Sequence, residues 1–251
     1  MIALTRPVPA SFANALCAAA PAEAIDFEQA CTQHAAYCAA LAALGAEVVM
    51  LPVGDALPDS CFVEDTAVVA AGVALITHPG APSRRAETFA TADALRTRYE
   101  LAHMDESATL DGGDCMRVGR TIFVGRSERT NAAGIARLTD VFEPRVIRVV
   151  AIDTPKLLHL KCVCAPLGDD RITLAEGSIS RSAFGDVDVV PIPAAESYAA
   201  NVVAIGNRVL VADGFPRTRD VLTRAGFQVT PVATTEFRKA DGALTCLSIL
   251  C

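Results

Sequence analysis

Polar residues interrupt five otherwise apolar segments of the chain, and their types are those that catalytic sites use. An acidic pair lies in Cys-Phe-Val-Glu-Asp-Thr, two aspartates in Leu-Asp-Gly-Gly-Asp, a histidine in Leu-Leu-His-Leu-Lys and a cysteine in Ala-Leu-Thr-Cys-Leu-Ser. The residues concerned are Glu64, Asp65, Asp111, Asp114, His159, Asn201, Thr245 and Cys246. Together, such side chains can supply a nucleophile, a proton carrier and a cation-binding surface.

Cys246 and His159 form the sharpest pair in this set. Each has an ordinary explanation when taken alone, because a histidine between Leu158 and Leu160 is typical of a core position and cysteine is often a small buried residue. Together they match the thiol and the base of a cysteine enzyme, which need to be close only in the fold. We therefore predict that Cys246 attacks an electrophile and that His159 transfers protons.

The adjacent Glu64 and Asp65 predict a cation at the same site. In an apolar strand their side chains would point in opposite directions, so at least one carboxylate would be buried. A buried carboxylate requires a cation or several donors, which a structural arginine or a cationic ligand could supply. Leu-Asp-Gly-Gly-Asp also has two interpretations: a turn built by glycine and aspartate, or carboxylates that orient the histidine.

A site rich in carboxylates narrows the substrates that a cysteine nucleophile could attack. Burial and neighbouring carboxylates raise the pKa of a thiol and so disfavour the reactive thiolate. A cationic substrate opposes this effect when it binds, whereas the neutral amide of a protease substrate does not. The sequence therefore favours a small cationic guanidinium or amidinium compound as the substrate.

The elements that must position these residues form a repeat of an apolar hairpin, a helix and a single strand. The first hairpin strands are expected at 62–70, 115–118, 160–165, 201–205 and 244–250, and the second at 73–77, 121–124, 171–175, 208–212 and 2–5. Turns at Ala-Gly, Gly-Arg, Gly-Asp-Asp and Gly-Asn join the complete hairpins. Helices are expected at 84–98, 131–142, 178–184, 216–225 and 26–44, and the last strands near 101 and at 146–152, 187–192, 228–232 and 47–51.

The fifth unit begins near the C-terminus and is completed by residues near the N-terminus. This arrangement predicts an α/β fold that closes through the two termini: a five-bladed αβ propeller with pseudo-fivefold symmetry, formed by a single catalytic domain over residues 1–251. Equivalent positions of a closed ring face one axis, so the polar groups would meet in a central pocket. A plain α/β sandwich with a similar order of elements is the alternative.

The composition excludes several classes of partner. The chain has 251 residues and a net charge of −7, which gives no positive field for nucleic acid or an anionic membrane. No window reaches the roughly 18 apolar residues of a membrane span, and the first residues lack the pattern of a signal peptide. A cytoplasmic location is therefore expected, where the nine cysteines would not form a disulfide framework. The only close cysteine pair, Cys162-x-Cys164, is a weak zinc signal and suits a strand with both thiols on one side.

At these positions the chain resembles the dimethylarginine dimethylaminohydrolase family of the guanidino-modifying pentein superfamily. The matching segments include Pro-Asp-Ser-Cys-Phe-Val-Glu-Asp, Pro-Gly-Ala-Pro-Ser-Arg-Arg-Ala-Glu, Leu-Asp-Gly-Gly-Asp, Val-Gly-Arg-Ser-Glu-Arg-Thr-Asn, Leu-His-Leu-Lys, Ala-Ala-Asn and Asp-Gly-Ala-Leu-Thr-Cys-Leu-Ser. They occur in order over nearly the whole chain. The resemblance implies a five-bladed αβ propeller, in agreement with the ring predicted from the repeat.

The resemblance also implies a role for each matching residue. Cys246 is expected as the nucleophile, His159 as the general acid and base, and Asp111 as the carboxylate that orients the histidine. The expected substrate contacts are Glu64 and Asp65 on the guanidinium, Arg84 and Arg129 on the α-carboxylate, Asp59 on the α-amino group, and Phe12 and the Ala240 backbone. Phe12 departs from the smaller apolar residue expected there, in a segment (7–24) that could be a loop, a lid or a short helix.

The implied reaction is hydrolysis of Nω-methylated arginine (asymmetric dimethylarginine or monomethylarginine) to citrulline and an alkylamine, through a covalent thiouronium on Cys246. No cofactor is implied, although zinc could inhibit by bridging Cys246 and His159. Arginine deiminase, a related guanidine hydrolase or an amidinotransferase are the enzymatic alternatives, and an arginine-binding regulatory protein is the non-enzymatic one. The sequence is compatible with a homodimer and does not specify the oligomeric state.

Overall fold

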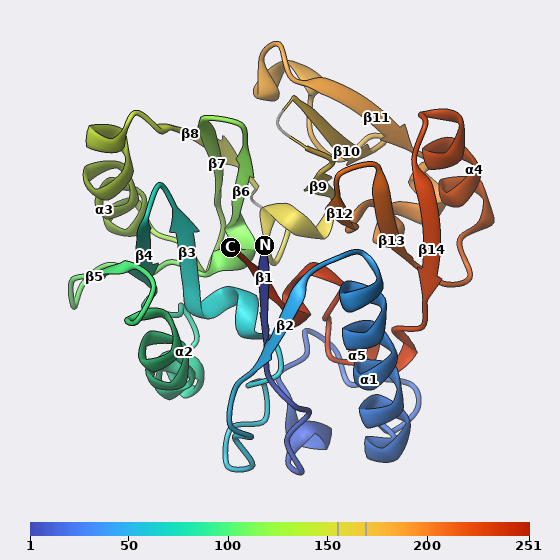
Figure 1. Cartoon of the computed structure of the whole chain (residues 1–251), viewed down its shortest axis with the longest axis horizontal. Helices are drawn as coiled ribbons and strands as arrows, with labels where there is room; N and C mark the ends of the chain where they lie inside the picture. Colours follow the sequence, from blue (N-terminus) through green and yellow to red (C-terminus); the bar gives the residue numbers. More distant parts are fainter. Residues whose placement is uncertain (155, 169) are drawn as a thin grey trace.

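The computed structural model describes residues 1–154, 156–168 and 170–251, in which fifteen strands form five three-stranded sheets (Figure 1). The sheets join β15 (Ile249–Leu250), β1 (Ile2–Thr5) and β2 (Glu47–Met50); β3 (Ala67–Ala70), β4 (Val73–Ile76) and β5 (Glu100–His103); β6 (Cys115–Val118), β7 (Thr121–Arg126) and β8 (Arg148–Asp153); β9 (Cys164–Pro166), β10 (Arg171–Ala175) and β11 (Asp188–Ile192); and β12 (Val203–Ile205), β13 (Arg208–Ala212) and β14 (Gln228–Val232).

All five sheets share one pairing pattern. The middle strand pairs antiparallel with the strand before it and parallel with the strand after it, as expected for a hairpin followed by a crossover connection. The crossovers contain α1 (Phe27–Ala43), α2 (Thr88–Leu95), α3 (Ala132–Phe142), the 3-10 turn η7 (Arg181–Phe184) and α4 (Pro216–Arg224). The repeat of hairpin, helix and strand is therefore confirmed, with a single 3-10 turn in place of the weak helix predicted at 178–184.

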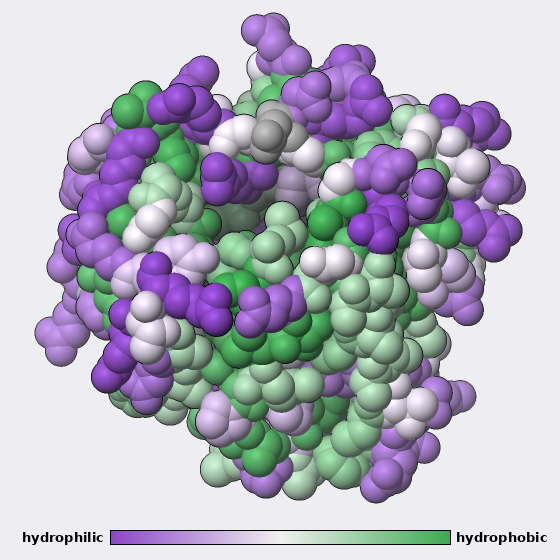
Figure 2. All heavy atoms as spheres, viewed as in Figure 1, coloured by the Kyte–Doolittle hydropathy of each residue, from purple (hydrophilic) through white to green (hydrophobic). Residues whose placement is uncertain are grey.

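The two chain ends complete one sheet between them. β15 pairs antiparallel with β1, and the backbones of Ile2 and Cys251 exchange hydrogen bonds of 2.6 and 2.9 Å. Both termini lie near the middle of the view in Figure 1, and the space-filling view of this face is hollowed beside them (Figure 2). The fifth unit predicted from the sequence is thus formed by residues from opposite ends of the chain.

Five buried apolar clusters fill the spaces between sheets. Four of the clusters each contain residues from two sheets that are consecutive in the chain. The remaining cluster joins the sheet of β12, β13 and β14 to the sheet of β15, β1 and β2. In that last cluster, Leu210 and Val232 pack with Ala3 and with Tyr37 of α1. No sheet therefore has a core of its own, and every sheet is stabilised by packing against two neighbours.

Several predicted elements differ locally from the structure. Short 3-10 turns occupy the beginnings of the segments predicted as strands at 62–70, 160–165 and 244–250, namely η2 (Val63–Thr66), η6 (Leu160–Cys162) and η9 (Thr245–Leu247). The reason is that polar side chains there need buried partners, which an extended strand would not let them reach. Only Cys164 of the close cysteine pair lies in a strand, so the prediction that both thiols share one side of a strand is wrong.

Other differences concern helices and one turn. The helix predicted at 84–98 is divided into η3 (Pro82–Glu87) and α2, while η8 (Ala194–Ala200) and α5 (Thr235–Lys239) were not predicted. Segment 7–24 contains only η1 (Phe12–Asn14) as regular structure. The turn predicted at 168–170 includes Asp169, which lies outside the described residues. Among the residues described, no helix combines the length and apolarity needed to cross a bilayer.

Candidate active site

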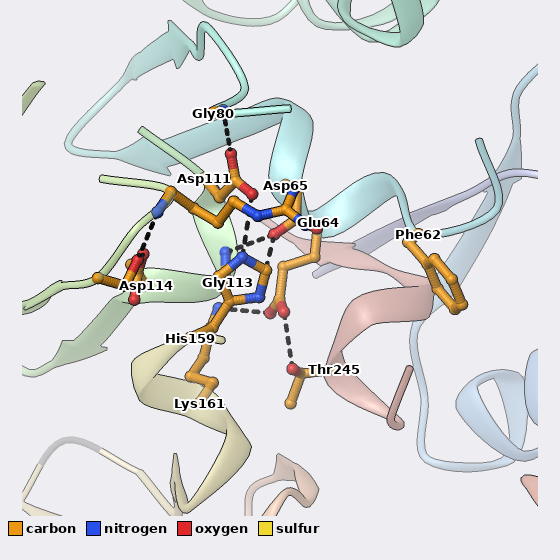
Figure 3. A network of polar contacts seen from close by, with 12 residues as sticks. Phe62, Glu64, Asp65, Gly80, Asp111, Gly113, Asp114, His159, Lys161 and Thr245 are labelled. Atoms are coloured by element: carbon orange, nitrogen blue, oxygen red, sulfur yellow. Dashed lines mark hydrogen bonds and ion pairs between the residues drawn. The ribbon is translucent and has the colours of Figure 1, made fainter. Parts of the chain in front are cut away.

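The polar residues singled out in the sequence lie on, or directly next to, 3-10 turns that precede the first strand of each sheet. These turns are η2, η4 (Gly112–Asp114), η6, η8 and η9, and η2 packs against both η4 and η9 while η4 packs against η6. The close-up in Figure 3 shows their side chains directed toward one another in a single network. The structure thus brings together residues that are up to 181 positions apart in the chain.

His159 is held by a carboxylate on each side of its ring. Its Nε2 lies 3.0 Å from Asp111 Oδ2, and its Nδ1 lies 3.9 Å from Asp65 Oδ1. Asp111 is fully buried, and its other oxygen accepts a hydrogen bond of 2.8 Å from the Gly80 backbone N–H. This arrangement fixes both the plane of the imidazole and the position of its protons.

Gly113 allows the histidine to approach the acidic turn. Its N–H donates a hydrogen bond of 2.8 Å to Asp65 Oδ1. A Cβ at this position would lie 2.5 Å from His159 Nδ1 and 2.8 Å from Asp65 Oδ1, which no side chain could occupy without displacing them. The second glycine of Leu-Asp-Gly-Gly-Asp is therefore required by packing against the histidine as well as by the turn.

Both carboxylates of the acidic pair already have a cationic partner in the protein. Asp65 Oδ2 accepts a hydrogen bond of 2.5 Å from Arg84 Nη1, and Glu64 is paired with Lys161. Arg84 also donates to both oxygens of the buried Glu87 and to the Phe62 carbonyl. A structural arginine was one of the two explanations that the sequence left open for this pair, and it applies to Asp65; the lysine partner of Glu64 was not predicted.

A cavity of about 30 Å³ contains seven of the ten residues predicted for the site. These residues are Asp59, Asp65, Arg84, Arg129, His159, Ala240 and Cys246. The remaining lining residues, which were not predicted, are Leu16, Phe62, Leu158, Asp241 and Gly242. The nucleophile, the imidazole and charged groups of both signs therefore face one small cavity.

Three predicted residues, Phe12, Glu64 and Asp111, are not part of this lining. Asp111 lies behind His159, while Glu64 faces a larger cavity of about 320 Å³ together with Lys161 and Thr245. Glu64, Lys161 and Thr245 are already paired with one another, so we place the chemistry in the smaller cavity, which both Cys246 and His159 line.

The structure corrects the prediction that Phe12 lies in the substrate site. Its ring is fully buried and packs against Phe62 at 5.8 Å and Phe237 at 5.6 Å between centroids. Leu16 occupies the cavity edge instead, and its N–H donates a hydrogen bond of 3.0 Å to Asp59 Oδ1. A signal for Leu16 was present in the sequence, because it is the only large apolar residue among the alanines that follow Phe12.

Burial and charge set the resting protonation states of the site. Burial alone would lower the pKa of His159, but Asp65 and the hydrogen bond that His159 donates to Asp111 raise it to about 9. Burial, followed by the charges of Glu64 and Asp65, raises the pKa of the Cys246 thiol well above its ordinary value. Burial would raise the pKa of Asp65, but His159 and Arg84 hold it at about 2. Near neutral pH the site therefore contains an imidazolium, a thiol and an ionised Asp65.

The only described group of three or more potential metal ligands close enough to share an ion is Asp65, Asp111 and His159. Cys246 does not belong to this group, and each of the three side chains already has a partner in the hydrogen-bond network. The geometry thus resembles an acid–base site more closely than a metal centre.

Comparison with known proteins identifies the family. A model of the eukaryotic N,N dimethylarginine dimethylhydrolase family matches residues 10–210. A Streptomyces coelicolor N(G),N(G)-dimethylarginine dimethylaminohydrolase is 41% identical over 246 residues, covering 97% of this chain and 94% of the relative. The chain belongs to the dimethylarginine dimethylaminohydrolase family, within the pentein superfamily. It is accordingly a hydrolase that acts on guanidino C–N bonds.

Two solved structures of this family superimpose closely on the chain. A cysteine-to-serine variant of the Pseudomonas aeruginosa enzyme in complex with citrulline has a TM-score of 0.94 at 33% identity, covering 98% of this chain and 97% of that one. A histidine-to-glycine variant of a dimethylarginine dimethylaminohydrolase, solved as an adduct with S-methyl-L-thiocitrulline, gives the same TM-score and identity with 98% of both chains covered.

Proposed function

We propose that this chain hydrolyses Nω-methylated arginine to citrulline and an alkylamine. The observation that carries the proposal is the joint presence of Cys246, His159 and Asp65 around one cavity, where the raised pKa of His159 and the lowered pKa of Asp65 favour their charged forms. Citrulline bound in a family member of 33% identity supports the identity of the product. We expect asymmetric dimethylarginine to be the preferred substrate and monomethylarginine to be an alternative substrate.

The proposed reaction begins when the substrate guanidinium binds beside Asp65. Its positive charge opposes the effect of the carboxylates on the Cys246 thiol, which releases its proton to solvent. The thiolate then forms a bond to the guanidinium carbon, and His159 donates its proton to the methylated nitrogen as the C–N bond to that nitrogen breaks. The products of this half-reaction are the free amine and a thiouronium on Cys246.

In the second half-reaction, the neutral His159 takes a proton from water, and the resulting hydroxide adds to the thiouronium carbon. The C–S bond then breaks as the hydroxyl proton of the intermediate passes to the departing sulfur, which restores the Cys246 thiol and releases citrulline. Each step uses groups that the cavity holds, and none uses a metal or an organic cofactor. The zinc inhibition expected from Cys246 and His159 remains a prediction.

The amino-acid end of the substrate would lie against the charged groups at the cavity edge. Arg84 and Arg129 suit an α-carboxylate, and Asp59 suits an α-amino group. Arg84 uses most of its N–H groups on Glu87, Asp65 and backbone carbonyls, so Arg129 would carry a large share of carboxylate binding. Leu16 would cover the aliphatic part of the substrate in place of Phe12.

Incubation with asymmetric dimethylarginine, monomethylarginine and arginine, with citrulline and amine measured separately, tests the proposal. We expect citrulline and dimethylamine in equal amounts from the first substrate, and the absence of dimethylamine would contradict the proposal. Ammonia and citrulline from arginine at a higher kcat/KM would instead indicate a deiminase. An amidinated product in the presence of glycine or lysine would indicate an amidinotransferase.

We further infer that the five sheets form a closed five-bladed αβ propeller with pseudo-fivefold symmetry. The pairing of β15 with β1 and the cycle of five inter-sheet clusters support this inference. The turns that carry the site would then surround the propeller axis, with the active cavity toward one end and the 320 Å³ cavity toward the other.

A further inference from the structure

We propose that Asn201 is a positioning residue, which fixes the turn of the nucleophile against the turn of the histidine. The proposal rests on the function proposed above, because it assigns Cys246 and His159 their catalytic roles. Asn201 follows η8 and lies outside the cavity lining, so it touches neither the reacting thiol nor the imidazole in the described structure.

Asn201 uses its whole amide to join the two turns. Its Nδ2 donates hydrogen bonds of 2.9 Å to the Lys161 carbonyl and 3.0 Å to Thr245 Oγ1. Its Oδ1 accepts a hydrogen bond of 2.9 Å from the Thr245 N–H. The side chain is 2% exposed, so water cannot replace these bonds. Only a carboxamide offers two donors and an acceptor in one plane at this length of side chain.

These contacts are part of a closed ring of buried hydrogen bonds. Thr245 Oγ1 donates a bond of 2.7 Å to Glu64 Oε2, and the second oxygen of Glu64 accepts from Lys161 Nζ. The Lys161 carbonyl returns to Asn201, so the ring connects turns from four of the five sheets. Figure 3 shows Glu64 between Thr245 and Lys161 in this network.

Each member of the ring apart from Asn201 is a close sequence neighbour of a residue in the active cavity. Cys246 follows Thr245, Asp65 follows Glu64, and His159 caps η6, the turn that contains Lys161. The ring therefore sets the distances between nucleophile, guanidinium-binding carboxylate and proton carrier without contacting the substrate. Asn201 and Glu64 both contact the nucleophile turn and the histidine turn directly, and Asn201 does so with three hydrogen bonds from one buried amide.

Two substitutions test the proposal against a matched control. Asn201→Leu removes all three hydrogen bonds, and Asn201→Asp keeps the acceptor but removes both donors. Gln33→Leu is the control, because Gln33 is also 2% exposed, accepts a hydrogen bond from the Glu236 N–H and donates one to Thr235 Oγ1, away from the cavity. All three variants would be compared at equal folded fraction, verified by thermal unfolding.

We expect both Asn201 variants to lower kcat about 100-fold and to change KM less than about threefold, since a displacement near 1 Å costs about this factor. A second measurement needs no turnover: the rates at which Cys246 is alkylated by cationic chloroacetamidine and by its neutral isostere chloroacetamide. The wild type and Gln33→Leu should prefer the cationic reagent, because Cys246 faces Asp65. The Asn201 variants should lose this preference.

Asn201 variants that match Gln33→Leu in kcat, or that keep the full preference for chloroacetamidine, would overturn the proposal. If Asn201→Leu does not fold, Asn201→Asp decides between the outcomes. A wild type that releases no citrulline would contradict the proposed function alone, because the alkylation preference still reports whether Asn201 positions Cys246.

Discussion

At the scale of the residue, the site depends on a histidine held between two carboxylates. Asp111 and Asp65 face opposite nitrogens of the His159 ring and raise its pKa to about 9, although burial alone would lower it. The same acidic surroundings, after burial, raise the pKa of the Cys246 thiol. In the resting enzyme His159 is therefore protonated and can donate to the leaving amine, whereas Cys246 remains a thiol until a cationic substrate binds.

Asp111→Asn tests this electrostatic arrangement. Loss of one carboxylate should lower the pKa of His159 from about 9, measured by NMR titration of its ring protons, and should lower kcat about 100-fold. Asp153→Asn, which removes an exposed partner of Arg126, should change neither quantity. An unchanged His159 titration in Asp111→Asn would show that Asp111 does not hold the imidazolium.

The same shift has a consequence for stability. Because the pKa of His159 in the folded protein lies above its ordinary value of 6.5, its stabilisation is complete below pH 6.5 and is lost as the pH rises through about 9. The free energy of unfolding, measured in urea, should therefore fall more steeply with pH across this window in the wild type than in Asp111→Asn. If the free energy of unfolding fell equally with pH in the two proteins, this would contradict a contribution of Asp111 to the raised pKa of His159.

At the scale of the element, short 3-10 turns carry the site, and the sequence predicted the strands beside them better than the turns themselves. Hairpins such as β12–β13 were predictable because Gly-Asn separates two apolar runs. The η2 turn was not predictable, because Val63 to Ala70 reads as one strand interrupted by Glu64 and Asp65, and its bend depends on distant partners such as Lys161. Leu16 was not predicted either: the sequence marks it as the one large apolar residue among the alanines after Phe12, but its contact with the cavity depends on the fold.

Gly113→Ala tests the role of the η4 turn. The added Cβ would approach His159 Nδ1 to 2.5 Å, so the ring must move and kcat should fall at least about 100-fold. Gly177→Ala is the control, because its Cβ would meet nothing within 4 Å and its positive φ costs only about 1 kcal/mol of strain. Activity in Gly113→Ala equal to that of the control would show that the close approach is unimportant.

At the scale of the whole molecule, every sheet is stabilised by packing against two neighbouring sheets. Each apolar cluster joins two sheets, and the first sheet depends on β15 from the end of the chain. Cys246 lies in η9, which directly precedes β15. Folding of the nucleophile turn is therefore tied to the pairing of β15 with β1, and this pairing could be predicted because the missing parts of the fifth unit are found near the N-terminus.

A circular permutant tests this closure. Joining residues 251 and 1 through a short glycine-serine linker, with new ends between the exposed Gly185 and Asp186, should preserve the fold and wild-type kcat/KM, because the termini already lie side by side. Circular dichroism and the citrulline assay would measure both. A matched chain that lacks residues 249–251 should lose stability and activity. A permutant as impaired as the truncated chain would contradict closure.

The central claim is that Cys246 forms a covalent bond to the guanidinium carbon of the substrate. Its most direct test is the mass of enzyme quenched in acid during turnover of asymmetric dimethylarginine, with the modified peptide sequenced by mass spectrometry. We predict an adduct on Cys246 with the mass of the substrate less dimethylamine, which is absent in Cys246→Ser. Turnover without any adduct on Cys246, or full activity of Cys246→Ser, would contradict the account.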